Sequence, residues 1–113
     1  MKFDDYQKQA IKTDVYGGKG DFLSIAFINK VLGLVGETGE FAEKVKKIQR
    51  NEKGELSEER RKELLKELGD VLWYLSALTH YLGGSLDELA NNNLAKLSDR
   101  KTRGVIKSEG DTR

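Results

Sequence analysis

The chain has 113 residues and a mass of 12.7 kDa, so we predict one domain that spans residues 1–113. Its 20 basic and 19 acidic residues leave a net charge of +1. This balance argues against nucleic acid as a partner, because proteins that bind it usually carry a clear basic excess. The absence of cysteine excludes disulfides, thiolate catalysis and cysteine-ligated zinc.

The first half of the chain contains two predicted helices. Apolar residues at helical spacing, from Phe3 to Val15, predict the first helix over about residues 3 to 16. The glycine-rich segment 17–20 is interpreted as a turn. A second, longer helix begins after a cap at Asp21 or Ser24 and continues to about residue 50.

The second half contains two more predicted helices, each preceded by a serine. Ser57 is a candidate cap for a helix that ends before Gly83, and Ser85 has the capping-box spacing to Glu88 at the start of a fourth helix. The tail over about residues 104–113 has no periodicity, and we expect it to be extended or mobile. No segment alternates like a strand, so we predict an all-α fold with a four-helix bundle-type subunit. The wide apolar arc of the third helix favours an oligomer.

Two pairs of acidic residues stand out because of their position. Glu37/Glu40 and Glu67/Asp70 are each one helical turn apart, and apolar neighbours at steps of three and four place Glu37 and Glu67 on core-facing lines. Two antiparallel helices can thus bring four carboxylates together. Such a group repels itself and loses hydration, so it either keeps protons or binds hard cations. We favour a site for Mg²⁺, with Mn²⁺ as the alternative.

Glycine recurs within the same segments. Gly33, Gly36 and Gly39 are spaced by three inside the second predicted helix, and Gly69 lies in the second acidic pair. A glycine in a helix interior costs roughly 1 kcal/mol relative to alanine. Two explanations remain open at this point: close packing of another helix, or the close approach of a ligand.

The fourth predicted helix changes from apolar to polar along one line. Asn93, Lys96 and Arg100 continue the stripe that begins at Leu86, and the heads of Lys96 and Arg100 can reach one anion. The alternative is that these basic residues only offset the helix dipole near its C-terminal end. Beside a carboxylate-bound cation, a role in binding polyphosphate is the better explanation.

Three motifs in this order resemble the MazG-like nucleoside triphosphate pyrophosphohydrolases, a branch of the all-α NTP pyrophosphatase superfamily. The resemblance covers about residues 25–110 and is carried by Gly36-Glu37-Thr38-Gly39-Glu40, by Glu67-Leu68-Gly69-Asp70-Val71-Leu72-Trp73-Tyr74 and by Asn93-Leu94-Ala95-Lys96-Leu97-Ser98-Asp99-Arg100. It implies a helical bundle that packs as a dimer or a dimer of dimers.

The resemblance also implies a reaction and a set of site residues. The reaction is the Mg²⁺-dependent hydrolysis of a (deoxy)nucleoside triphosphate to the monophosphate and pyrophosphate, by attack of a metal-activated water at the α-phosphorus, as nucleotide-pool housekeeping. The implied metal ligands and catalytic residues are Glu37, Glu40, Glu67 and Asp70. The implied substrate-binding residues are Lys96 and Arg100 for phosphate, Asn93, and Tyr74 for the base.

Alternatives to this function remain. A relative specific for dUTP or phosphoribosyl-ATP would use the same motifs, and a non-catalytic helical interaction module would carry the acidic residues on its surface. Convergence of the four carboxylates distinguishes the enzymes from the module. The sequence has no apolar run of about 18 residues and no signal-peptide core after Met1, so we expect a cytoplasmic protein with no membrane partner.

Overall fold

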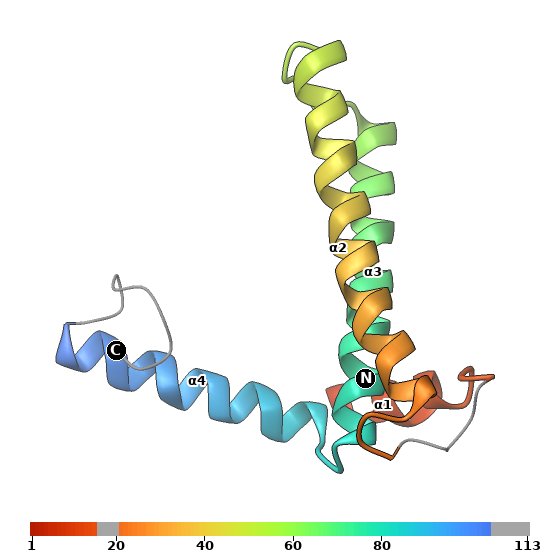
Figure 1. The fold of residues 1–113 in the computed structure, drawn as a ribbon. Coiled ribbons are helices and arrows are strands. Elements are labelled where there is room, and N and C mark those ends of the chain that lie inside the picture. The colour runs from red at the N-terminus through yellow and green to blue at the C-terminus, as the bar shows by residue number, and fades with distance from the viewer. Residues whose placement is uncertain (16–20, 105–113) are drawn as a thin grey trace.

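The computed structural model describes residues 1–15 and 21–104, and these residues form four α-helices and no strand (Figure 1). The predicted turn at 17–20 and the predicted tail after Gly104 lie outside the described residues. The all-α prediction is confirmed. The helices are α1 (Phe3–Ile11), α2 (Ile25–Asn51), α3 (Glu58–Tyr81) and α4 (Leu86–Arg103).

Serine side chains start the three long helices. The hydroxyls of Ser24, Ser57 and Ser85 each accept a hydrogen bond at 3.1 Å from the backbone N–H three residues later. These bonds satisfy N–H groups that have no partner within the helix, which is why the helices begin there. Ser24 is therefore the cap of α2, rather than Asp21.

The first helix is shorter than predicted, because α1 ends at Ile11 and not near residue 16. Thr13 turns back on the helix, where its hydroxyl donates to the Ala10 carbonyl at 2.7 Å. Asp14 then points into the interior, whereas Val15, which we expected on the apolar side, is 87% exposed. A tertiary role for Asp14 thus overrides the helical spacing of the apolar residues.

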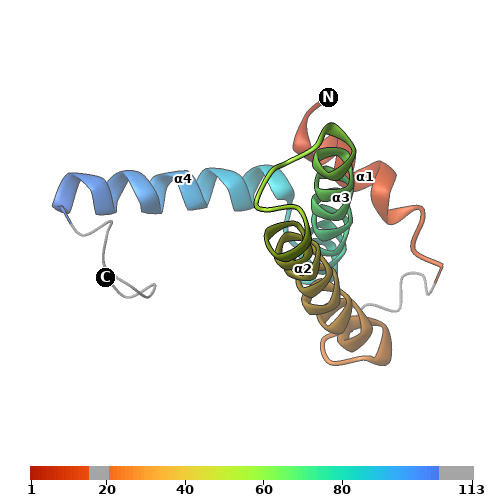
Figure 2. The same cartoon turned by 90° about the horizontal axis from the view of Figure 1, so that it is seen from above.

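The helices do not close into a four-helix bundle within one chain. Helices α2 and α3 form a long antiparallel hairpin, α1 packs beside the lower part of α3, and α4 leads away from the hairpin (Figures 1 and 2). The radius of gyration is 16.9 Å, whereas a compact domain of this length has about 13 Å. The extended shape leaves much of the hairpin without an intramolecular neighbour.

The direction of α4 is fixed where it meets α1. The buried amide of Gln7 donates to the Gly84 carbonyl at 3.0 Å and accepts from the Leu86 N–H at 2.7 Å. The carboxylate of Asp4 accepts from the Asp87 N–H at 2.9 Å. Side chains of the first helix thus satisfy the first free N–H groups of the last helix and hold its N-terminus in place.

Candidate functional site

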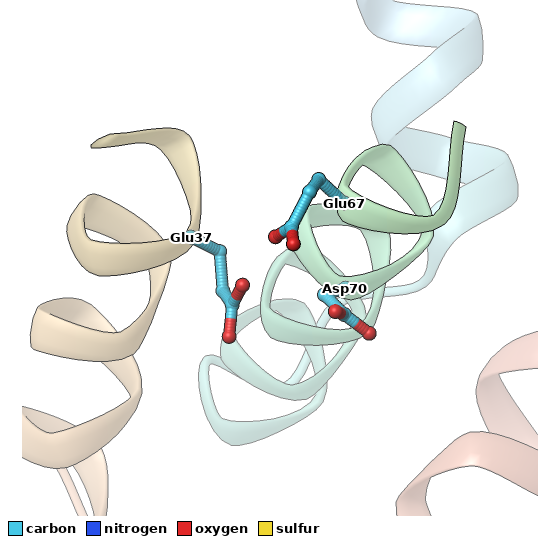
Figure 3. A group of neighbouring side chains, drawn as sticks. All are labelled: Glu37, Glu67 and Asp70. Carbon is cyan, nitrogen blue, oxygen red and sulfur yellow. The ribbon is translucent and has the colours of Figure 1, made fainter. Parts of the chain in front are cut away.

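Three of the four predicted carboxylates meet between α2 and α3. Glu37 on α2 faces Glu67 and Asp70 on α3, and one carboxylate oxygen from each lies within 4.8 Å of the other two (Figure 3). Glu37 is half-buried because it lies in the seam between the two helices. Glu67 and Asp70 reach the same place because they are one helical turn apart on α3.

Partial burial and mutual repulsion both act on this carboxylate cluster, and burial is the larger cause at Glu37. The pKa of Glu37 is raised from 4.5 to about 7 by partial burial, and further by a hydrogen bond with the Glu67 carboxyl and by the charges of Glu40, Asp70 and Glu67. That hydrogen bond requires that one of the two carboxyls keeps a proton. Without a cation, the cluster is therefore protonated in part near neutral pH.

Glu67 has the environment expected of a ligand to a hard cation. Its side chain is 12% exposed, and its Oε1 lies 3.5 Å from the Nζ of Lys44. Its other oxygen, Oε2, is buried and receives no hydrogen bond from the described residues. A buried carboxylate oxygen without a donor is costly unless a cation or a proton compensates it. The donor set of three carboxylates matches the oxygen preference of Mg²⁺ and Mn²⁺.

The raised pKa of Glu37 predicts a pH dependence of stability. In the folded, metal-free chain Glu37 holds its proton up to about pH 7, whereas its ordinary pKa is 4.5. Its stabilising contribution is thus complete below pH 4.5 and is lost as the pH rises through 7. Thermal unfolding in EDTA should show that Glu37→Gln loses less stability than the unaltered chain over this range. Equal pH dependence of the two chains would contradict the burial of Glu37 in the cluster.

Glu40, the fourth predicted carboxylate, lies outside the group of three. It is exposed on α2, one turn after Glu37. Its charge nevertheless contributes to the raised pKa of Glu37, so it lies within electrostatic range of the cluster. The sequence pattern places only Glu37 of this pair on a core-facing line, and Glu37 is the less exposed of the two.

Tyr74 lies in the seam between α2 and α3, where its ring packs against Gly33. A side chain at position 33 would overlap the Tyr74 ring, so glycine is required for this close approach. Close helix packing therefore explains Gly33. Gly36, Gly39 and Gly69 differ, because a β-carbon at each would meet no described atom within 4 Å.

The predicted phosphate-binding residues do not join the carboxylates of their own chain. Asn93 and Lys96 line a groove of about 790 Å³ in the angle between α3 and α4, opposite Leu72 and Leu75. Two residues of an α-helix are rotated by about 200°, so Leu72 and Asp70 face nearly opposite sides of α3. The groove and the carboxylate cluster are thus on different faces. Arg100, further along α4, is 3% exposed.

The structure adds a residue that the sequence did not indicate. Burial raises the pKa of the Tyr6 phenol, and the charge of Asp70 raises it further. Tyr6 therefore brings α1 beside the carboxylate cluster. No motif marks this tyrosine, because its proximity to Asp70 depends on how α1 packs against α3.

Three carboxylates converge from two helices, and one buried oxygen of Glu67 has no donor among the described residues; together they define a candidate divalent-cation site on an all-α scaffold. The sequence model of the MazG nucleotide pyrophosphohydrolase domain matches residues 27–105, and the chain belongs to this family. This finding confirms the resemblance carried by the three motifs. None of the helices described is long and apolar enough to cross a membrane.

The chain is similar to the Gene 37 protein of Mycobacterium phage L5. The two are 47% identical over 114 residues, and the alignment covers 100% of each chain. No solved structure matches the chain significantly.

Proposed function

We propose that the protein hydrolyses (deoxy)nucleoside triphosphates to monophosphate and pyrophosphate in a Mg²⁺-dependent reaction. The observation that carries this proposal is the cluster of Glu37, Glu67 and Asp70 in a chain of the MazG family. When bound, Mg²⁺ would neutralise charge on the triphosphate and activate water for attack at the α-phosphorus. We further propose a cytoplasmic role in maintaining the nucleotide pool.

The residues of the site have separate roles in this proposal. Glu37, Glu67 and Asp70 hold the cation, and Glu40 joins them as a fourth ligand from its exposed position one turn along α2. Lys44 neutralises part of the charge of Glu67 at 3.5 Å. The closely packed Tyr74 limits the space available to the base.

A homodimer, alone or within a tetramer, is part of the same proposal. The two helices of the hairpin each carry a second apolar stripe outside their shared seam, with residues at steps of three and four. All of these residues are exposed except the half-buried Leu72. We call them the outer stripes: Ile25, Ile28, Leu32 and Val35 on α2, and Leu65, Leu68, Leu72 and Leu75 on α3. Such stripes are typical of helices that pack against further helices, and the open space at Gly39, in line with the α2 stripe, permits close approach.

A second copy would also supply the predicted phosphate-binding side chains that the carboxylate cluster lacks within one chain. Because Asn93 and Lys96 lie on the face of α3 opposite to Asp70, we place them, together with Arg100, at the carboxylates of a partner subunit. Guanidinium and ammonium groups suit phosphate oxygens. The complete site would thus combine the hairpin of one copy with α4 of the other.

A product assay tests the reaction. We expect monophosphate and pyrophosphate from common NTPs and dNTPs in the presence of Mg²⁺, and no turnover in EDTA, because the carboxylates alone cannot neutralise a triphosphate. Release of diphosphate and phosphate would contradict cleavage at the α-phosphorus. Turnover confined to dUTP or to phosphoribosyl-ATP would identify the protein as a pyrophosphohydrolase specific for that substrate. Failure to bind Mg²⁺, together with no turnover, would favour the non-catalytic module.

A further inference from the structure

A buried ion pair lies in the same seam as the carboxylate cluster but is not part of it. The Nζ of Lys30 on α2 lies 3.1 Å from Oδ1 of Asp14, and the two side chains are 4% and 1% exposed. The hydroxyl of Tyr81 on α3 donates a short hydrogen bond to the other oxygen of Asp14. Three segments are thereby joined: the turn after α1, helix α2 and helix α3.

Aromatic rings surround this ion pair. The ammonium of Lys30 lies 5.7 Å from the centroid of Trp73 and 5.5 Å from that of Tyr81. The indole N–H of Trp73 donates to the Thr13 hydroxyl at 2.8 Å, which ties the same turn to α3 a second time. The contacts of Lys30 with the two rings require a particular distance between α2 and α3.

The position of the ion pair relates it to the carboxylates. Lys30 precedes Glu37 by seven residues, which is two turns or about 10 Å along the same face of α2. On α3, Trp73 follows Asp70 by one turn. When no cation is bound and the carboxylates are ionised, their repulsion favours separation of α2 and α3 at Glu37. A fixed contact nearby in the seam opposes this separation.

Stability alone does not account for a buried ion pair here. The desolvation of two charges offsets much of their attraction, and apolar residues of similar size often stabilise a core as well or better. A pair that is hydrogen-bonded to a third element does, however, restrict the geometry more than apolar contacts do, because its bonds tolerate little displacement. Because the ion pair lies beside carboxylates that repel one another when ionised, the restricted geometry can hold α2 and α3 at a fixed distance there.

We propose that Asp14, Lys30 and Tyr81 form an interhelical clamp that sets the distance between Glu37 on α2 and the Glu67–Asp70 pair on α3, so that the site is formed before the cation binds. The clamp residues are positioning residues and do not touch the substrate. The inference rests on the proposed metal site. Mutation of residues that hydrogen-bond metal ligands typically costs about 10- to 100-fold in metal affinity, and we place the clamp, which acts through the helices, at the lower end of this range.

Calorimetric titration of the full chain with Mn²⁺ tests the clamp. Tyr81→Phe removes the bond to Asp14 but keeps the ring beside Lys30, and the double variant Asp14→Asn/Lys30→Met removes both charges together. We expect each to bind Mn²⁺ about tenfold more weakly while remaining folded. Glu67→Gln removes a proposed ligand, so the heat of Mn²⁺ binding that is lost in this variant is the heat of binding at this site.

Ile48→Val is the matched control, because Ile48 is buried in the same seam at its far end. It should lower Tm slightly and leave Mn²⁺ affinity unchanged. The fluorescence of Trp73, the only tryptophan, provides a second readout, since its emission should shift in the clamp variants even without metal.

Three outcomes would overturn the clamp, and they are distinguishable. Equal Mn²⁺ affinity in the unaltered chain and in Tyr81→Phe would overturn the clamp alone. A loss of Mn²⁺ affinity in proportion to the loss of Tm in all variants, Ile48→Val included, would show that the clamp residues contribute only ordinary core packing. Absence of Mn²⁺ binding in the unaltered chain would overturn the clamp together with the metal site.

Discussion

Glu67→Gln is expected to abolish turnover, with a fall in kcat of about a thousandfold or more, equivalent to about 4 kcal/mol in the activation free energy. The glutamine side chain has nearly the same shape, so it removes charge from the centre of the cluster with little change in packing. The neutral amide of the glutamine would occupy the position of the buried Oε2 and would offer no negative charge to a cation there. Steady-state product assays over a range of Mg²⁺ concentrations measure the effect.

Glu63→Gln is the matched control for this experiment. Glu63 lies one turn earlier on α3 and forms a partly exposed ion pair with Arg60 at 2.9 Å. Pairs of this kind contribute little to stability, so the variant should retain normal activity. Near-normal turnover by Glu67→Gln would contradict the proposed site. Glu40→Gln, assayed beside it, tests the fourth ligand: we expect it to abolish turnover as well.

Leu32→Asp is expected to separate the proposed dimer. Leu32 is 63% exposed at the middle of the outer stripe of α2, on the face opposite to Glu37. A carboxylate buried there without a partner would cost about 4 kcal/mol or more, which weakens association by about a thousandfold. Sedimentation at micromolar concentration should show a monomer with unchanged helical content. Turnover should fall by about a hundredfold or more, because α4 of a second copy would no longer reach the carboxylates.

Leu56→Asp serves as the control for the change from leucine to aspartate. Leu56 lies between α2 and α3 and is 55% exposed, but it belongs to neither outer stripe. This variant should sediment and react like the unaltered chain. A Leu32→Asp protein that remains dimeric, or a monomer that keeps full activity, would contradict the shared site.

The sequence predicted those parts of the structure that depend on local contacts. The starts of α2, α3 and α4 follow from Ser24, Ser57 and Ser85, because a capping hydroxyl acts on an N–H only three residues away. The approach of Glu37 to Glu67 also follows from local patterns, since apolar neighbours on each helix place both side chains in one seam. The antiparallel pairing of those helices then brings the two carboxylates together.

Features that depend on distant contacts were not predictable in this way. The early end of α1 results from the pairing of Asp14 with Lys30, sixteen positions later in the chain. The separation of Lys96 from the carboxylates results from the direction of α4, which Gln7 and Asp4 fix from the first helix. Helical periodicity describes one helix at a time and contains no information about either contact.

The contacts of Gln7 and Asp4 with the start of α4 also constrain the order in which the chain can fold. They join residues that are 77 to 83 positions apart in a sequence of 113 residues. Helices form from local contacts before such distant partners meet, and long loops slow the final step. During synthesis, the hairpin of α2 and α3 can therefore assemble while the last helix is still absent. The contacts of Gln7 and Asp4 with the start of α4 form only after nearly the whole chain has left the ribosome.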